Sequence, residues 1–293
     1  ALWYLSYTHP HPPLTPLFFY WNMYRDVPVA TPSVGEWAED PDSVPLALRQ
    51  RRSQGESMSD YAVRAARRAF YALSTHIDHQ LRVVIGTLRE EGLLDDTIIL
   101  FTSDHGDMLG NHGLWAKRLY YERSANVPMI LVGGSDGRVP HHAVDDRLVG
   151  WQDVMPTLLA AAEQPLPQDR EIDGENVLPL ITEGALAGAE WPRQTLYWSS
   201  GHNRIVRHGD WKLQIAARPE TQWLFNLAED PTEQVNLAES RPDKVSELMV
   251  LLDAHAAKSR PALYEPELEA PVAIDKHLAL PFEEGDEWVS VPN

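Results

Sequence analysis

The sequence predicts an α/β domain with a largely parallel sheet, followed by a smaller antiparallel unit that carries a helix. Two short apolar runs, residues 97–102 and 127–134, have the composition of buried strands. Helical patterns precede the first run and follow the second, and strands that alternate with helices are typical of an α/β fold. From about residue 195 the chain changes to short alternating runs broken by Gly, Asn and Asp, which indicates an antiparallel meander.

The N-terminal region predicts one strand and a long loop. Residues 2–7 (LWYLSY) have the pattern of a buried strand, and residues 10–45, rich in proline and aromatic side chains, predict an ordered loop or surface excursion. Because a buried strand is an unusual first element for a large domain, we expect that sequence lies upstream and that the chain is the C-terminal part of a larger fold.

Two helices in the α/β part are predicted from the spacing of apolar residues. The first begins near Ser57, Ser59 or Asp60, where a hydroxyl or carboxylate can cap it, and runs to about residue 91, where Gly92 ends it. The second covers residues 149–164 and has Pro156 near its start, where proline is tolerated.

The C-terminal third predicts a separate unit and a tail. Residues 242–258 form a final helix after the meander, and the segment after Arg260, dense in Pro and Glu, is expected to lie extended over the surface or a partner. We therefore divide the chain into the α/β part (residues 1–190), a small α+β subdomain (191–260) and an extended tail (261–293).

Composition excludes several classes of function. The 25 Lys and Arg against 43 Asp and Glu give a net charge of −18, which argues against a nucleic-acid or anionic-membrane partner. A small anionic substrate would need local cations and a metal to overcome this field. The sequence has no cysteine, so it contains no disulfide and no thiolate nucleophile. Its first residues lack the basic region of a signal peptide. Neither observation decides between a cytoplasmic and a periplasmic location. No apolar run approaches the roughly 20 residues that span a bilayer.

The stretch SDHGD, residues 103–107, places an acid and an imidazole together at the end of a predicted strand. Ligand sites of open α/β sheets lie beyond the carboxyl ends of strands, and Gly106 permits the loop that lets Asp104 and His105 converge. Oxygen ligands suit Ca²⁺ or Mg²⁺, whereas an imidazole moves the preference toward Mn²⁺ or Zn²⁺. From spacing alone, an N-cap aspartate beside a surface histidine is the alternative.

Three further polar residues are candidates for the same site. In THPHPP, prolines restrain His9 and His11, and a rigid imidazole after a strand suits a general acid or an anion-binding group; a proline-rich turn with an exposed histidine is the alternative. Lys117 lies on the next structured segment after Asp104, where the plain interpretation is a solvated lysine. His112 is interpreted as a residue that makes local hydrogen bonds.

Taken together, these segments resemble the sulfatase family of the alkaline-phosphatase-like superfamily. LSYTHPHPP is similar to the family's strand followed by a PHxP segment, and residues 76–134, which include TIILFTSDHGDMLGNHGLWAKR, resemble its most recognisable region. VGWQDVMPTLL and VRHGDWKLQI resemble later signatures in the correct order. The resemblance implies an α/β sandwich around a large mixed, mostly parallel sheet, with a small C-terminal antiparallel sheet and helix.

The resemblance also implies roles for particular residues. Asp104 and His105 match a metal-binding acid and its neighbour for one divalent ion, Ca²⁺ or Mn²⁺; a histidine at this second position is found in the branch of phosphonate monoester hydrolases and choline-sulfatase-like enzymes. His11 matches the histidine near the transferred group, and Lys117 matches the lysine that binds its anionic oxygens. The family's paired N-terminal metal acids and its formylglycine or serine nucleophile have no counterpart here, so they are expected in a missing upstream segment.

Three residues, at two places in the chain, depart from the pattern that the family commonly shows. Thr8 and His9 replace a more usual His-Asp pair, so His9 is a candidate to take over a neighbouring role. Asn126 stands where an arginine commonly precedes Val-Pro, and a supporting ion pair is expected to be absent there.

Three functions remain open from the sequence. The first is hydrolysis of a small sulfate ester, and the second is hydrolysis of a phosphonate or phosphate ester, favoured by His105. The third is a non-catalytic binding or assembly module. A homo-oligomer is compatible with an extended tail that wraps a neighbouring subunit.

Overall fold

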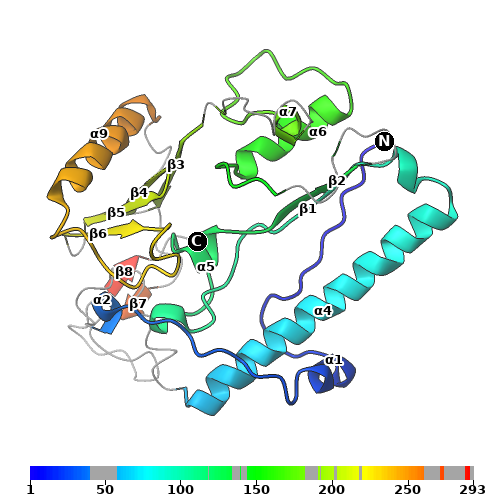
Figure 1. Cartoon of the computed structure of the whole chain (residues 1–293), viewed down its shortest axis with the longest axis horizontal. Helices are drawn as coiled ribbons and strands as arrows, with labels where there is room; N and C mark the ends of the chain where they lie inside the picture. Colours follow the sequence, from blue (N-terminus) through cyan, green and yellow to red (C-terminus); the bar gives the residue numbers. More distant parts are fainter. Residues whose placement is uncertain are drawn as a thin grey trace.

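The computed structural model describes the α/β part and the C-terminal sheet in most of their length (Figure 1). The residues it describes are 1–39, 58–117, 119–133, 139, 144–181, 191, 193–200, 203–217, 220–260, 271–273 and 288–290. No helix among them is both long enough and apolar enough to cross a bilayer.

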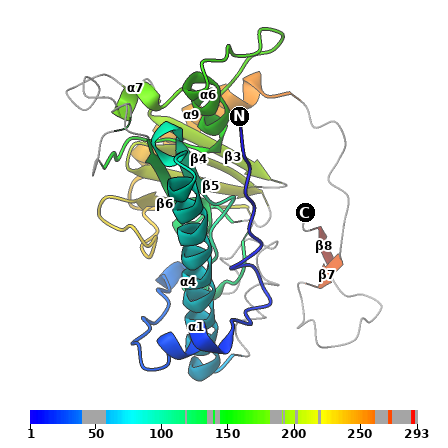
Figure 2. The same ribbon diagram turned by 90° about the vertical axis from the view of Figure 1, so that its right-hand side faces the viewer.

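The first predicted helix is confirmed as α4 (Asp60–Glu90). Ser59 caps it by accepting a hydrogen bond from the Ala62 backbone N–H at 3.3 Å, and Gly92 follows its end with a φ of 68°, a left-handed value that glycine tolerates. The short helix α1 (Phe18–Met23) lies beside it, where the hydroxyls of Tyr24 and Thr75 are 2.6 Å apart. Figures 1 and 2 show the N-terminal segment running alongside α4.

The two predicted apolar strands exist, but they pair in the opposite sense from the one expected. β1 (Ile99–Thr102) and β2 (Met129–Val132) are antiparallel, with Ile99 opposite Val132. A parallel pair needs a crossover that returns the chain to the starting end, usually a helix. Here the described residues between the two strands form only loops, the one-turn segment η3 (Asn111–Gly113) and the four-residue helix α5 (Glu122–Ala125), so β2 starts where β1 ended. Neither strand is fully buried; Ile130 is 52% exposed.

The expectation of a buried strand at residues 2–7 is wrong for this structure. These residues form no strand, and their large apolar side chains are exposed, Tyr4 to 82%. An apolar run becomes a strand only when a neighbouring strand satisfies its backbone hydrogen bonds, and none of the described residues provides one. The expected loop at residues 10–45 contains α1 and the short α2 (Glu36–Glu39), and its final residues, from 40 on, lie outside the described part of the chain.

The second predicted helix is confirmed as the one-turn segment η4 (Trp151–Asp153) followed by α6 (Val154–Ala161), with Pro156 in its first turn; the short α7 (Leu178–Ile181) follows. Asp153 is fully buried at the junction of η4 and α6. Its carboxylate accepts the backbone N–H groups of Gly150 and Glu175, each at 2.8 Å, and pairs with Arg193. This carboxylate therefore joins the helix to the start of the C-terminal unit.

The predicted meander is confirmed as a four-stranded antiparallel sheet in the order β3-β4-β5-β6. Its strands are β3 (Thr195–Ser200), β4 (Asn203–His208), β5 (Trp211–Ala217) and β6 (Glu220–Asn226). The final helix α9 (Pro242–Lys258) begins and ends as predicted and covers one face of this sheet, where Leu248 packs in a buried apolar cluster with Leu213 and Leu224.

The opposite face of the C-terminal sheet packs on the α/β part. Trp223 and Phe225 of β6 are buried with residues of the segment that links β1 to β2: Met108, Leu114, Leu119 and Tyr121. Trp37 lies against the same cluster, stacked on Tyr121 with ring centroids 5.2 Å apart. Successive side chains of a strand point to opposite faces of the sheet. The sheet therefore packs on α9 with one face and on the segment that links β1 to β2 with the other.

Most of the predicted tail, residues 261–293, lies outside the described residues. Two short strands within it are described, β7 (Pro271–Ala273) and β8 (Trp288–Ser290), and they pair antiparallel.

His112 lies inside the contact between the two parts. Its ring is close to those of Trp37 and Tyr121, its side chain is almost completely buried, and its Nδ1 accepts a hydrogen bond from the Gly35 backbone N–H at 3.2 Å. His112 is therefore a hydrogen-bonding residue, as interpreted, but its partner Gly35 is 77 positions away in the sequence, so its role is tertiary and not local. Burial lowers the pKa of His112 to about 4, although the Thr232 backbone and Asp230 oppose this shift.

This pKa predicts a loss of stability in mild acid. Between pH 6.5 and 4 the unfolded chain binds a proton at His112 that the folded protein does not, so the free energy of unfolding falls as the pH falls through this window, by at most about 3 kcal/mol. Denaturant unfolding at pH 7 and at pH 5 measures the change. H112N, which keeps a polar side chain but does not titrate there, should lose a smaller part of its own stability over the same interval; an equal loss in both proteins would contradict the assignment.

Candidate active site

Asp104 and His105 leave the end of β1 in a turn that brings their side chains together. The Asp104 Oδ1 accepts the His105 backbone N–H at 3.0 Å, and the Ser103 hydroxyl donates to the His105 carbonyl at 2.7 Å. The His105 Nδ1 lies 2.8 Å from the Gly106 carbonyl oxygen, which can only accept, so Nδ1 carries the hydrogen. The His105 Nε2 therefore presents a lone pair, and it lies 3.4 Å from Asp104 Oδ2.

This geometry fits two ligands of a divalent cation. Two acceptors that face each other at 3.4 Å repel one another unless a cation or a proton lies near both. A carboxylate and a neutral imidazole are suitable metal donors, and the second ring nitrogen is held by a carbonyl, as is common for metal-binding histidines. Among the described residues no group of three or more His, Asp or Glu side chains converges on one point, so this part of the chain supplies only part of a coordination shell.

His11 and Lys117 are brought together from distant parts of the chain. The Lys117 Nζ lies 2.6 Å from the His11 Nε2. The His11 Nδ1 lies 2.7 Å from the Pro12 carbonyl oxygen, so Nδ1 donates there and Nε2 accepts the hydrogen bond from the Lys117 ammonium. The neighbouring His9 packs on His76 of α4, with ring centroids 5.9 Å apart. The structure therefore pairs the two residues predicted to contact the anionic group, whereas His9 faces α4.

Asp107 is a residue of this region that the sequence interpretation missed. Its Oδ1 accepts the Leu109 backbone N–H at 3.0 Å. Burial raises its pKa, and the charges of Lys117 and His105 oppose that shift, so this carboxyl group is in electrostatic reach of both halves of the site. The signal was present in the sequence as the second acid of DHGD.

The loop from Gly106 to Lys117 is held in a strained shape. Three residues other than glycine, Leu109, His112 and Ala116, have φ between 46° and 64°. Each such residue costs about 1–2 kcal/mol in the left-handed region, so surrounding contacts must compensate. Buried Arg67 of α4 donates to the Leu109 carbonyl at 2.8 Å, and the Ser33 carbonyl accepts the His112 backbone N–H at 2.8 Å. These contacts determine where Lys117 emerges.

Gly106 joins the loop to α5 with no space for a side chain. Its backbone N–H donates to the Ser124 carbonyl at 2.8 Å, and a Cβ atom at this position would lie 2.1 Å from the Arg123 carbonyl oxygen. The sequence interpretation gave Gly106 only conformational freedom, but close approach of two backbones is its stronger requirement.

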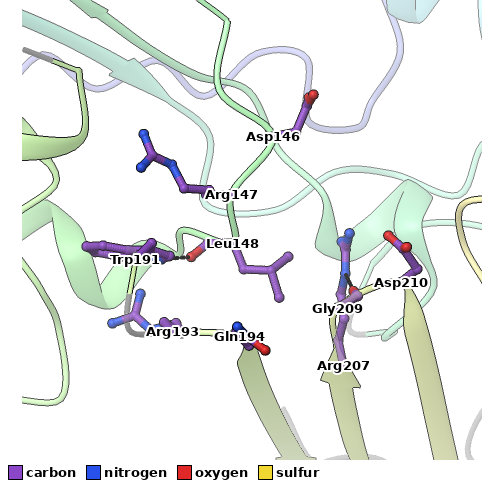
Figure 3. Close-up of a pocket in the computed structure, with 9 residues that line it drawn as sticks. All are labelled: Asp146, Arg147, Leu148, Trp191, Arg193, Gln194, Arg207, Gly209 and Asp210. Atoms are coloured by element: carbon purple, nitrogen blue, oxygen red, sulfur yellow. Dashed lines mark hydrogen bonds between the residues drawn. The ribbon is translucent and has the colours of Figure 1, made fainter. Parts of the chain in front are cut away.

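An open hollow of about 670 Å³ lies between residues 146–148 and the edge of the C-terminal sheet (Figure 3). The Trp191 indole N–H donates to the Leu148 carbonyl at 2.8 Å across it. Its three arginines are already engaged: Arg193 pairs with Asp153, Arg207 with Glu122 and Arg147 with Asp145. Nearby, the Trp151 indole N–H donates to the Ser103 carbonyl beside Asp104. None of the predicted site residues lines the hollow, and its arginines serve structural contacts.

The sequence comparisons identify the family. The Sulfatase family profile matches residues 1–164, and the profile for the C-terminal part of N-sulphoglucosamine sulphohydrolase matches residues 110–259. The chain belongs to the sulfatase family.

Curated relatives agree with this assignment. An arylsulfatase of Clostridium perfringens is 34% identical over 247 residues, which is 82% of this chain and 50% of the relative. A choline-sulfatase of Rhizobium meliloti is 36% identical over 245 residues, 80% of this chain and 46% of the relative. The multifunctional alkaline phosphatase superfamily protein PehA of Trinickia caryophylli is 32% identical over 80% of this chain and 51% of its own length. The chain thus spans about half the length of these relatives.

Solved structures confirm the alkaline-phosphatase-like α/β fold. The phosphonate monoester hydrolase of Silicibacter pomeroyi superposes with a TM-score of 0.72 at 22% identity, over 97% of this chain and 59% of that one. The corresponding enzyme of Agrobacterium radiobacter gives 0.70 at 22% identity, over 89% and 57%. At this identity the likeness concerns the fold. The sulfatase family generally uses a divalent metal and a formylglycine, and the Asp104–His105 pair has the donor chemistry for such a metal.

Replacing Gly106 by alanine should disturb this site. The new Cβ would meet the Arg123 carbonyl, so the loop and α5 must separate, and we expect the free energy of unfolding to fall by about 1–3 kcal/mol and Mn²⁺ binding to weaken. G86A is the matched control: Gly86 lies inside α4, and a Cβ added there would meet no other atom within 4 Å, so alanine should stabilise the protein by about 0.5–1 kcal/mol. Unchanged metal binding in G106A would contradict this account of the contact.

Proposed function

We propose that the protein containing this chain is a metal-dependent hydrolase of small sulfate esters. The observation that carries the proposal is the 2.6 Å contact between Lys117 and His11, residues far apart in sequence. Burial raises the pKa of Asp107, which lies in the loop between His105 and Lys117, and the charges of both residues oppose that rise. This supports placing the Lys117–His11 and Asp104–His105 pairs in one region. A cation, an imidazole and a partial metal site together suit an ester with an anionic head.

Lys117 is proposed to bind the oxygens of the sulfuryl group. Its ammonium has three N–H donors, of which one is engaged by the His11 Nε2, so two remain for the substrate. In a protein of net charge −18 such a local cation is needed to hold an anion. Donors aimed at the charge that develops on a transferred group are often a large contribution to catalysis.

His11 is proposed to stand at the leaving oxygen. Its Nδ1 is held by the Pro12 carbonyl, which fixes the ring and leaves Nε2 as the atom that exchanges a proton. For this role the Nε2 must first release the Lys117 N–H. Protonated there, the imidazole would donate to the departing alkoxide; neutral, it would accept a proton from an incoming water.

Asp104 and His105 are proposed to hold one divalent cation, Ca²⁺ or Mn²⁺, with further ligands from outside the described residues. The imidazole in the pair favours Mn²⁺, and the exposed carboxylate suits either ion. When bound, the metal would act as a Lewis acid on the anionic head of the ester. Because the sequence has neither a cysteine nor the family's C/S-x-P-x-R motif, the nucleophile, a formylglycine or serine, is proposed to come from residues outside these 293.

Phosphonate or phosphate ester hydrolysis is the second candidate, and His105 favours it. An imidazole ligand moves the metal preference of the site toward the transition metals. The same Lys117 and His11 would contact a phosphoryl group as readily as a sulfuryl group, so the described residues by themselves do not separate the two ester classes. The third candidate, a non-catalytic module, predicts metal and anion binding without turnover.

The activity test compares aryl sulfate with an aryl phosphonate monoester, using the full-length protein with Mn²⁺ and with Ca²⁺. A higher kcat/KM on the sulfate supports the proposal, and a higher value on the phosphonate supports the second candidate. Absence of turnover on both, with metal bound, would contradict both and support the module. Removal of metal with a chelator should abolish turnover, and re-addition should restore it.

Replacing Lys117 by methionine should reduce kcat/KM on the better ester by about 100- to 1000-fold, the usual effect of losing one such donor. Because Lys117 is not a buried residue, thermal stability should change little. K258M at the exposed end of α9 removes the same charge far from the site and should leave kcat/KM unchanged. Equal effects of the two substitutions would show that only the overall charge matters and would contradict the role of Lys117.

A further inference from the structure

A buried group of charges joins the C-terminal sheet to α5. The Lys212 side chain on β5 is 2% exposed, and its Nζ lies 2.9 Å from Glu122 Oε1 and 2.8 Å from Glu233 Oε1. Arg207, opposite Lys212 on β4, reaches Glu122 Oε2 at 3.3 Å. Two cations from the sheet thus face one carboxylate from α5 and one from the segment after β6.

Glu122 is the first residue of α5, and the C-terminal unit holds both its side chain and its backbone. The Glu233 Oε2 accepts the Glu122 backbone N–H at 2.7 Å. Lys212 and Arg207 outweigh the effect of burial on Glu122 and lower the pKa of its carboxyl group, so this residue is ionised at neutral pH. The Asn126 side chain, which stands where the family commonly has arginine, also hydrogen-bonds Glu122. The cations for Glu122 therefore come from the sheet.

The opposite side of α5 contacts the proposed metal loop. Gly106 donates to the Ser124 carbonyl at 2.8 Å and has no space for a side chain against Arg123. The Gly106 carbonyl in turn accepts the hydrogen from His105 Nδ1, which directs the His105 Nε2 toward Asp104. A continuous chain of contacts therefore runs from Lys212 through Glu122 and α5 to Gly106 and His105.

We propose that Lys212 is a positioning residue for the metal-binding loop, acting on His105 through Glu122 and α5. The proposal rests on the metal site of the proposed function and adds a role for the C-terminal sheet. α5 has only four residues and little stability of its own, so its place depends on these anchors. Removing Lys212 would leave the carboxylates of Glu122 and Glu233 buried close together without their shared cation, so they would repel each other. Separation of the two carboxylates would move α5 and the loop it supports.

The experiment measures metal binding without substrate, by calorimetric titration of the metal-free full-length protein with Mn²⁺ and with Ca²⁺. K212M keeps a long apolar side chain and removes the charge, and we expect its Kd to rise by about 10-fold or more, as for other groups that orient metal ligands. E122Q, which keeps the shape of the side chain and loses its charge, should weaken binding in the same direction and carries the test if K212M does not fold.

The matched control is L213A. Leu213 is the next residue of β5, is completely buried and packs on the opposite face against α9. This variant should lower the melting temperature, as K212M does, but leave the Kd for metal unchanged. A Kd in K212M and E122Q that is equal to that of the unaltered protein would overturn the proposal, and so would a loss of affinity in L213A as large as that in K212M.

The outcomes separate this proposal from the proposed function. An unaltered protein that binds metal and turns over no ester refutes the hydrolase and leaves the positioning role to be decided by the Kd values. Ester turnover together with unchanged metal affinity in both charge variants refutes the positioning role alone. An unaltered protein that binds neither ion overturns the positioning role.

Discussion

The packing of the segment that links β1 to β2 against the C-terminal sheet is the contact on which the rest of the structure depends. Met108, Leu114 and Tyr121 of this segment are buried against Trp223 and Phe225 of β6. Burial of these side chains is worth roughly 1.5–3 kcal/mol for each large one, enough to offset the three left-handed residues of the loop. The C-terminal sheet is therefore part of the support of the site.

This arrangement explains why one segment carries so many proposed site residues. Asp104 and His105 lie directly before the loop from Gly106 to Lys117, and Lys117 lies at its end. Fixing the loop at Leu109, at His112 and at α5 leaves its two ends little freedom. The fixed backbone of the loop therefore positions the side chains at its two ends. A site that binds charged groups needs side chains that are held in place in this way.

The sequence predicted those parts of the fold that depend on local pattern. The caps of α4 at Ser59 and Gly92, the bounds of α9 and the alternation of β3 to β6 are all local signals, and all are confirmed. The direction of β2 and the exposure of Leu2 to Leu5 were missed because the pairing of a strand depends on residues that are distant in the sequence, which local pattern does not show. At the site, spacing indicated Asp104 and His105, the prolines of THPHPP made His11 a candidate beside the alternative of an exposed histidine, and the family resemblance supplied Lys117. None of these signals indicated the Lys212–Glu122 contact, because buried ion pairs leave no periodic pattern in a sequence.

The central claim is that Asp104, His105, Lys117 and His11 form one site for a metal and an anion. A crystal structure of the full-length protein with Mn²⁺ and inorganic sulfate tests this most directly. The account predicts an anomalous manganese peak within bonding distance of Asp104 and His105 Nε2, with sulfate oxygens on the Lys117 ammonium and next to the His11 Nε2. Manganese bound elsewhere, or a sulfate that contacts neither Lys117 nor His11, would contradict it.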